Sequence, residues 1–299
     1  MDKIVLKGYK DRDFSFYAFE IEGPDYIMCV AHGVAEDALR YTYFAQKLNE
    51  AGYSVYVINH IAHGQDYKVE ELGHWEKGDF DGCIENIHVM SEYAKSLHPN
   101  AKPILFGHSM GSFIVQKYEL LYPHEFKAHI LCGCAYADAL YKLGKMMSAT
   151  VRLFKKGTAR SPFMNNIAFG PFNKKFKPNK TSVDWLSANE ENCIKYEQDP
   201  YCGFVCTSSF YKEFYKNVSA VPNKKYNHLY AKDYPILLIG GANDMVSNMG
   251  KRLTKLEKYY AKQSDNVKAI LYPNDRHEIL NEDDKDQVIL DIINFVKEH

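Results

Sequence analysis

Short apolar runs recur along the chain, separated by longer stretches in which apolar residues return every three or four positions. The short runs are rich in Val, Ile, Phe and Tyr and about four to eight residues long, which is typical of β-strands. We expect strands at Phe14–Ile21, Tyr26–Ala31, Ser54–Asn59, Pro103–Phe106, His129–Cys132, Ile236–Ile239 and Val267–Tyr272. The spacing in the longer stretches predicts α-helices at Leu39–Ala51, Cys83–Leu97, Met110–Tyr122, Leu253–Ala261 and Lys285–Val296.

The order of these elements predicts the fold class. Several strands are apolar at successive positions, as strands buried on both faces are, and they alternate with helices. We therefore expect an α/β protein with a doubly wound, mostly parallel sheet. The alternation stops near Tyr136 and resumes near Tyr234, and so long a structureless loop would be unusual. We expect an inserted helical cap at 136–233 over a core made of 1–135 and 234–299.

Composition and charge exclude several classes of protein. The chain has 299 residues, of which 46% are hydrophobic, enough for a sizeable core. Its 37 basic and 38 acidic side chains give no electrostatic reason to expect nucleic acid. Seven cysteines, mostly inside apolar runs, indicate reduced thiols and no metal site. The charged amino terminus does not resemble a secretion signal and no run is long enough for a transmembrane segment, so we expect a cytoplasmic protein.

The clearest chemical motif is the run from Gly107 to Gly111, which reads Gly-His-Ser-Met-Gly. It follows a predicted strand and opens a predicted helix, which is the context of a nucleophile elbow. Glycines stand two residues on either side of Ser109 because such a tight turn leaves no room for side chains there. We predict that Ser109 is a nucleophile; the alternative is a glycine-rich turn with an idle serine.

A serine nucleophile needs a base and a group that orients the base. Asp244 and His277 each follow a predicted strand near the carboxyl end of the chain, at the same edge of the sheet. We predict His277 as the base and Asp244 as the acid. Asp275 is an alternative acid, but it lies only two residues from His277 in the same loop. Three further histidines flank predicted strand ends: we expect His32 and His63 to shape loops, and the side chain of His108 to point away from the adjacent Ser109.

Acyl transfer also needs hydrogen-bond donors for the negative oxygen of the intermediate. The run His32-Gly33-Val34 directly follows a predicted strand, and Met110 follows the nucleophile. Backbone N–H groups at these two places are the usual donors, so we predict those of Val34 and Met110. The alternative for Val34 is an ordinary glycine turn.

With these motifs together, the chain resembles the lysophospholipase and monoacylglycerol lipase branch of the α/β-hydrolases, often grouped with serine aminopeptidase-like hydrolases. The resemblance covers nearly the whole length and implies the α/β-hydrolase fold with a helical cap. The cap and the carboxyl-terminal motifs are its most specific parts. It is carried by His32–Val34, Gly107–Gly111, Asp184–Ser187 with Tyr196 and Asp199–Pro200, Gly240–Asp244 and Arg276–Glu282.

The resemblance implies a serine hydrolase that cleaves carboxylic esters of acyl lipids, monoacylglycerol or lysophospholipid, through an acyl-enzyme and without a cofactor. Aromatic residues of the cap could line an acyl pocket or form the cap core: Phe154, Phe163, Met164, Phe169, Phe172 and Phe176. As substrate-binding residues we expect His32, Gly33, His108, Phe163, Phe169 and Phe172.

Other functions stay open. One is a general carboxylesterase, and another is an aminopeptidase, which would need cap acids such as Glu190 and Glu191 to hold a free amino terminus. A third is a catalytically silent ligand-binding relative. A basic cluster beside the cap aromatics suggests weak peripheral membrane contact, with a solvated face as the alternative: Lys174, Lys175, Lys177 and Lys180. The sequence gives neither acyl length, head group nor oligomeric state.

Overall fold

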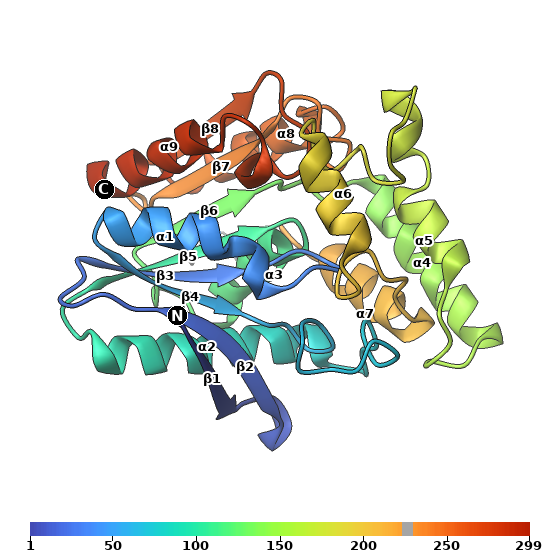
Figure 1. Ribbon diagram of the computed structural model, residues 1–299, viewed down its shortest axis with the longest axis horizontal. Coiled ribbons are helices and arrows are strands. Elements are labelled where there is room, and N and C mark those ends of the chain that lie inside the picture. Colours follow the sequence, from blue (N-terminus) through green and yellow to red (C-terminus); the bar gives the residue numbers. More distant parts are fainter. Residues whose placement is uncertain (223–229) are drawn as a thin grey trace.

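The computed structural model describes residues 1–222 and 230–299 and contains one eight-stranded sheet at its centre (Figure 1). The strand order across the sheet is β1-β2-β4-β3-β5-β6-β7-β8. The strands are β1 (Asp2–Lys7), β2 (Asp13–Phe19), β3 (Tyr26–Ala31), β4 (Tyr53–Ile58), β5 (Lys102–His108), β6 (Ala128–Cys132), β7 (Ile236–Gly241) and β8 (Val267–Tyr272).

The pairing confirms the predicted mostly parallel, doubly wound sheet. β2 pairs antiparallel with both β1 and β4, and all other neighbouring strands are parallel. All seven predicted strands are present, whereas β1 was not predicted. β1 lies at the edge of the sheet and alternates between exposed and half-buried positions, with charged residues among them. It therefore lacks the continuous apolar run that marks the buried strands.

Helices cover both faces of the sheet, which explains why its inner strands are apolar on both sides. On one face lie α1 (Thr42–Glu50) and α9 (Lys285–Glu298), and their buried residues share a core with the strands. The second face is covered by α2 (Asp79–Leu97), α3 (Met110–Leu121) and α8 (Lys251–Tyr260). The five predicted helices are all present, and α2 begins four residues earlier than predicted, with two acidic residues in its first turn that favour a helix start.

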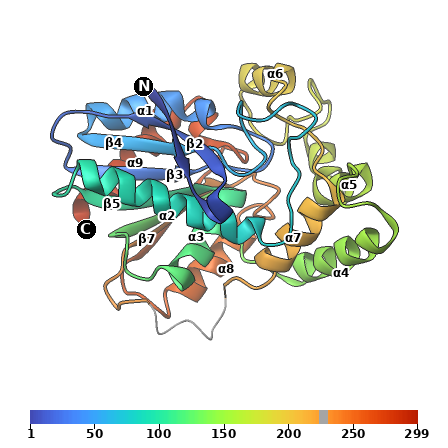
Figure 2. The same cartoon turned by 90° about the horizontal axis from the view of Figure 1, so that it is seen from below.

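Between β6 and β7 the chain leaves the sheet and forms further helices. These are α4 (Ala139–Phe154), α5 (Pro162–Phe169), α6 (Glu190–Gln198) and α7 (Ser208–Val218). They lie beyond the carboxyl ends of the parallel strands, and both views show them gathered at one end of the molecule (Figures 1 and 2). Residues 223–229 of the expected cap lie outside the described residues. The division of the chain into core and cap domains at 135 and 234 stays a prediction.

Two further features bear on the expectations from sequence. All seven cysteines are buried and carry free thiols. Among the helices in the described ranges, none has the length and apolar character needed to cross a bilayer.

Candidate active site

The run that contains Ser109 forms a sharp turn between β5 and α3. Ser109 has φ 51° and ψ −114°, in a region that residues other than glycine seldom adopt. Hydrogen bonds hold the turn on both sides: the Ser109 N–H donates to the Cys132 carbonyl at 2.9 Å, and the Ser112 hydroxyl donates to the Ser109 carbonyl at 2.6 Å. The strained conformation therefore has local support, as is common at functional sites.

The two glycines of the motif are required by close packing of the backbone. A Cβ atom on Gly107 would lie 2.4 Å from the Gly111 carbonyl oxygen. A Cβ atom on Gly111 would lie 2.0 Å from the Ala31 carbonyl oxygen, at the end of β3. Any side chain at either position would push α3 away from the sheet, so the motif fixes where Ser109 sits.

The structure brings Ser109, His277 and Asp244 together. The His277 Nε2 atom lies 2.9 Å from the Ser109 Oγ atom, and His277 Nδ1 lies 3.0 Å from Asp244 Oδ1. His277 follows β8, Asp244 follows β7, and both side chains are buried. With Nδ1–H donating to a carboxylate, Nε2 is left as the acceptor for a hydroxyl proton. Chemically, the arrangement can draw a proton from Ser109.

Asp244, and not Asp275, contacts the histidine. The backbone N–H groups of Val246 and Ser247 donate to its two carboxylate oxygens at 2.8 and 3.2 Å, which fixes the side chain. Burial, together with the nearby Asp284 carboxylate, raises the pKa of Asp275 to about 7. The described contacts of His277 include Asp244 and no bond to Asp275.

His32 orients the peptide that links Gly33 and Val34. Its Nε2 atom accepts the His60 N–H at 3.1 Å, so Nδ1 carries the proton and donates to the Gly33 carbonyl at 2.7 Å. Burial lowers the pKa of His32 to about 4, and the ring is neutral near pH 7. The C=O and N–H of a trans peptide point in opposite directions. With the Gly33 carbonyl directed toward His32, the Val34 N–H therefore points away from His32.

The two candidate oxyanion donors lie next to Ser109. Gly33 packs directly on the serine, since a Cβ atom there would lie 3.2 Å from Ser109 Cβ. In the described part of the chain, the Val34 and Met110 N–H groups are absent from the backbone hydrogen bonds. They are therefore available to a ligand that binds at Ser109.

A buried ionic network, which the sequence analysis did not find, surrounds these loops. Arg40 donates to both carboxylate oxygens of Glu278 at 2.6 Å and to Glu36 at 2.9 Å. Glu36 accepts the Gly33 N–H, and Glu278 directly follows His277. The Arg40 guanidinium also lies 4.8 Å from the centre of the Tyr196 ring, on α6. The network therefore connects the Gly33 loop, the His277 loop and the cap.

His108 completes this network beside the serine. Its Nδ1 atom faces Glu36 Oε1 at 3.1 Å, and its Nε2 atom faces the His277 carbonyl oxygen at 3.3 Å. Since both neighbours are acceptors, the protonated ring can donate to each of them. Burial opposes this charge, but the Glu36 carboxylate raises the pKa of His108 above the ordinary value. Both ring nitrogens thus contact protein atoms, and the side chain is turned toward Glu36.

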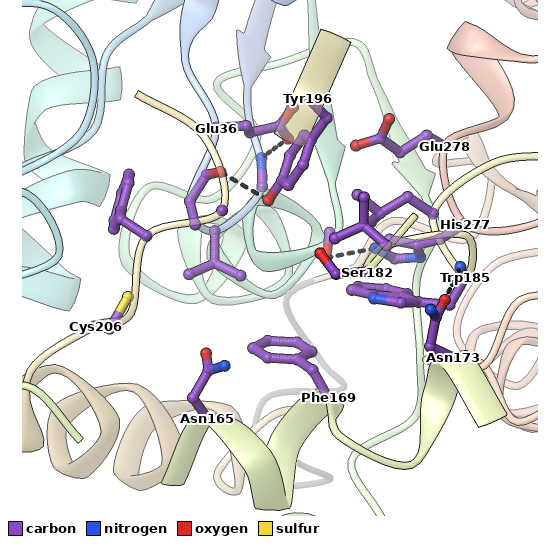
Figure 3. Close-up of a pocket in the computed structure, with 18 of the residues that line it drawn as sticks. Glu36, Asn165, Phe169, Asn173, Ser182, Trp185, Tyr196, Cys206, His277 and Glu278 are labelled. Atoms are coloured by element: carbon purple, nitrogen blue, oxygen red, sulfur yellow. Dashed lines mark hydrogen bonds between the residues drawn. The ribbon is translucent and has the colours of Figure 1, made fainter. Parts of the chain in front are cut away.

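Two cavities meet at Ser109. The first, of about 310 Å³, is called the polar cavity here because several amide and hydroxyl side chains line it (Figure 3). The second, of about 430 Å³, is called the apolar cavity because most of its wall is aliphatic and aromatic. Four residues line both cavities: Val34, Ser109, Phe169 and Tyr211.

The structure separates the predicted cap aromatics into different groups. Phe169 lines both cavities, Phe172 lines the apolar one, and Met164 is buried in the core. The expectation that Phe163 lines the acyl pocket is corrected: its side chain is 58% exposed and lies outside both cavities. Phe163 and Met164 are neighbours on α5, so they point to different faces of the helix.

The remaining expected residues have other surroundings. Phe154 is exposed at the end of α4, and the ring of Phe176 lies 4.1 Å from the Arg276 guanidinium. Trp185, part of a cap motif in the sequence, lies beside His277 with ring centres 5.4 Å apart and lines the polar cavity. Its role next to the histidine was not predicted, since the two residues are far apart in sequence.

One group of side chains has the spacing of a metal site in the described ranges, and it is separate from the cavities. It consists of His88, Glu92 and Glu125. The Lys95 ammonium bonds to both carboxylates, at 2.8 Å from Glu125, and so already supplies a positive charge there.

A family model described as serine aminopeptidase, S33, matches residues 22–284. The chain belongs to this family of α/β-hydrolases. A monoacylglycerol lipase of Mycolicibacterium smegmatis is 27% identical over 278 residues, covering 92% of this chain and 89% of the relative. A monoglyceride lipase homolog of Monkeypox virus is 24% identical, covering 92% and 90%.

Solved structures share the fold over almost the entire chain. A thermostable carboxyl esterase from Bacillus coagulans, in complex with glycerol, superposes with a TM-score of 0.91 at 24% identity, covering 99% of this chain and 98% of the esterase. A soluble variant of monoglyceride lipase from Saccharomyces cerevisiae gives 0.75 at 17% identity, covering 100% and 94%. These likenesses confirm the α/β-hydrolase fold.

Replacing Gly111 tests the close packing under the turn. Gly111→Ala adds a Cβ atom that collides with the Ala31 carbonyl, while the helical backbone itself accepts alanine. We expect the free energy of unfolding to fall by about 3 kcal/mol, measured by urea denaturation. Gly157→Ala is the control, because its nearest atoms lie at 3.4 Å, and it should change stability by less than about 0.5 kcal/mol. Equal effects of both changes would contradict this account of the motif.

The buried histidine His60 makes the protein sensitive to acid. Both of its ring nitrogens lack a hydrogen-bond partner among the described residues, and burial lowers its pKa well below the ordinary value. The unfolded chain binds a proton at this residue near pH 6.5 and the folded protein does not. The free energy of unfolding therefore falls as the pH drops below about 6.5, by up to about 1.4 kcal/mol per pH unit.

We expect His60→Phe to remove this contribution. Between about pH 6 and 4, the slope of the unfolding free energy against pH should decrease by about 1.4 kcal/mol per pH unit, which corresponds to one proton. Urea denaturation at each pH measures this slope. Near pH 7 the variant should be at least as stable, because it no longer buries two unpaired nitrogens. His299→Gln, at the exposed carboxyl terminus, is the control and should keep the wild-type slope. An unchanged slope in His60→Phe would show that His60 titrates normally.

Proposed function

We propose that this protein is a serine hydrolase that cleaves the ester of a long acyl chain and a small neutral alcohol, with a monoacylglycerol as the leading substrate. The observation that carries the proposal is the hydrogen-bonded chain from Ser109 through His277 to Asp244, placed where the polar and apolar cavities meet. The names of the relatives, lipases and an esterase, support the same class of reaction.

In the proposed mechanism, His277 Nε2 takes the proton of Ser109 as Oγ attacks the carbonyl carbon of the ester. The N–H groups of Val34 and Met110 donate to the negative oxygen that forms. The intermediate collapses when His277 gives its proton to the leaving alcohol oxygen, which leaves an acyl group on Ser109. Water, deprotonated by His277, then attacks the carbonyl carbon of this ester, and His277 returns that proton to Ser109 Oγ as the bond to Oγ breaks and the fatty acid leaves. Asp244 holds the histidine in the required tautomer throughout.

The apolar cavity fits the acyl chain. Its volume of about 430 Å³ lies in the usual range for ligand pockets. Side chains from α3, α4, α5 and α7 form its wall, including Phe113, Met147, Ile167 and Phe214. An acyl chain bound there would gain about 25 cal/mol of binding free energy for each Å² of apolar surface removed from water.

The polar cavity fits a neutral alcohol better than a phosphate-bearing head group. No lysine or arginine is among the described residues that line it, and its carboxylates, Glu36 and Glu278, already bind Arg40 behind the wall. Asn165 accepts the Tyr211 hydroxyl proton at 2.9 Å with its side-chain oxygen, which leaves its amide N–H groups for a substrate hydroxyl (Figure 3). A lysophospholipid would bring a phosphate to a cavity without a lysine or arginine, where both ring nitrogens of His108 already face protein acceptors, and this disfavours it.

The pairing of the carboxylates in and near the polar cavity also bears on the alternative functions. An aminopeptidase needs an unpaired carboxylate for the free amino terminus, but Glu278 pairs with Arg40, and Glu36 pairs with Arg40 and His108. The cap residues Glu190 and Glu191 pair with lysines and do not line the polar cavity. A general carboxylesterase would use the same triad, and differs in having no preference for long chains. A silent ligand-binding relative would use the cavities without the reaction.

Fatty-acid release from a lipid panel tests the proposal. We expect the wild type to hydrolyse long-chain monoacylglycerols, at least about tenfold faster by kcat/KM than lysophosphatidylcholine of the same chain. Ser109→Ala should lose nearly all activity, by a factor of about 10⁴ or more, and should not react with a fluorophosphonate probe that labels the wild type. Labelling without lipid hydrolysis would indicate a short-chain esterase. Failure to label the wild type would indicate a silent relative.

Narrowing the apolar cavity tests the placement of the acyl chain. Met147→Trp should fill part of the cavity and lower kcat/KM for a sixteen-carbon monoacylglycerol by about tenfold or more, with little effect on a four-carbon ester. Leu290→Trp is the control, because this residue on α9 is 47% exposed and lies outside both cavities. The same loss for short and long chains would place the acyl group elsewhere.

A further inference from the structure

Helix α4 turns an apolar stripe toward solvent. Met146 is 68% exposed, Leu153 80% and Phe154 82%, and Leu143 is also exposed. With about 100° of rotation per residue, these four positions fall within about 100° of one another around the helix axis, on one side of the helix. The opposite side carries the buried residues Gly144 and Ser148. Globular helices normally direct the apolar stripe inward, so this exposed one needs an explanation.

Positive charge is concentrated in the same part of the chain. Residues 139–183 contain ten lysines and arginines and no aspartate or glutamate. The whole chain has 37 basic and 38 acidic side chains, so the remaining residues have 27 basic and 38 acidic ones. The near-neutral total therefore conceals two regions of opposite charge.

Five of these cations lie on α4 or directly after it and are not neutralised. None of them forms an ion pair with a residue in the ranges 1–222 and 230–299. Together with the four stripe residues they form what we call the α4 patch: Leu143, Met146, Leu153 and Phe154 with Lys142, Lys145, Arg152, Lys155 and Lys156. Both ribbon views place α4 at the outer side of the cap, away from the sheet (Figures 1 and 2).

We propose that the α4 patch docks the protein on an anionic lipid surface. An apolar stripe flanked by lysines and arginines matches the two layers of such a surface, since the stripe enters the acyl boundary and the cations bind the head groups. A second copy of the chain fits less well, because two α4 patches placed face to face would bring like charges together. The patch therefore selects a partner that is both apolar and negatively charged.

The patch is continuous with the apolar cavity. Leu143 belongs to the stripe and lines the cavity, and Leu140, one turn earlier on α4, is likewise exposed and lines it. Under the proposed function, an acyl chain could pass from the lipid surface to Ser109 along this side of α4. This delivery step rests on the proposed function, but docking does not.

The lysines that first suggested a membrane contact are less suitable. Lys180 is paired with Glu190, and the nearby Phe176 ring is covered by Arg276. The α4 patch has its cations and its exposed apolar side chains on one helix and the residues that follow it.

Vesicle co-sedimentation tests docking apart from catalysis. The full chain with Ser109→Ala is mixed with vesicles of phosphatidylcholine alone or with about one-third phosphatidylglycerol, at low and high salt. We expect at least about tenfold stronger binding to the anionic vesicles, and loss of most of that difference in about 0.5 M salt. The proposal would be overturned if the protein did not bind vesicles, or if its binding did not depend on the lipid charge and the salt concentration.

Variants assign the binding to the patch. Leu153→Ser with Phe154→Ser removes two stripe residues outside both cavities, and Lys142→Gln, Lys145→Gln, Lys155→Gln and Lys156→Gln together remove four charges. Each set should weaken binding to anionic vesicles by about tenfold or more. Matched controls away from α4 are Leu121→Ser with Leu290→Ser, and Lys127→Gln, Lys258→Gln, Lys262→Gln and Lys297→Gln together, both of which should bind as before.

The remaining readouts distinguish the other outcomes. All variants, made with Ser109 intact, should cleave a soluble short ester at the wild-type rate. If the variant with Leu153→Ser and Phe154→Ser does not, it is misfolded, and the vesicle binding of the variant with the four lysine substitutions then tests the proposal. Equal binding by the patch variants and the controls would overturn the proposal. So would a concentration-dependent dimer, detected by sedimentation velocity, that the stripe variant abolishes. Soluble-ester activity with no vesicle binding would refute docking while leaving the proposed function intact.

Discussion

The close approach of α3 to the end of β3 is the constraint on which the active site depends. Only glycine fits at Gly111, because the Ala31 carbonyl occupies the place of a side chain. This contact sets the sharp turn that gives Ser109 its strained conformation, and it puts the start of α3 beside the loop after β3. Ser109 and both candidate oxyanion donors are therefore held by one backbone contact, before the side chains of Asp244 and His277 contribute.

Much of the fold and of the candidate triad could be predicted because the signals are local. Buried parallel strands appear as apolar runs, and the residues that follow them meet at one edge of the sheet. That reasoning led to Ser109, Asp244 and His277, which the structure places in one hydrogen-bonded chain. Strand β1 was missed for the same reason, since an edge strand that is half exposed has no such run.

The ionic network and the division of the cap aromatics could not be predicted, because neither leaves a local pattern. Arg40 and Glu278 are far apart in sequence and appear as ordinary surface charges, yet they form a buried pair. Phe163 and Phe169 look alike in an aromatic segment, but α5 exposes the first and turns the second into the cavities. Tertiary packing decides which face of a cap helix points inward. The eight residues of α5 are too few for the spacing of apolar positions to reveal that face.

The anchoring of α6 limits how the site can admit a substrate. Tyr196 donates its hydroxyl proton to the Ala35 carbonyl at 2.8 Å, and Asn192 bonds to both Arg40 and Glu278. Lifting α6 would remove the Asn192 hydrogen bonds and the Tyr196 ring from the buried Arg40–Glu278 pair, at a cost of about 1–3 kcal/mol for each hydrogen bond left unmade. Among the described residues, no ion pair joins a side chain of α4 or α5 to the loops that carry Gly33 and His277, and Asp138, which caps α4, pairs with Arg252 on α8. Under the proposed function, a substrate would enter on the α4 and α5 side, while α6 would act as a fixed wall beside the loop that carries Val34.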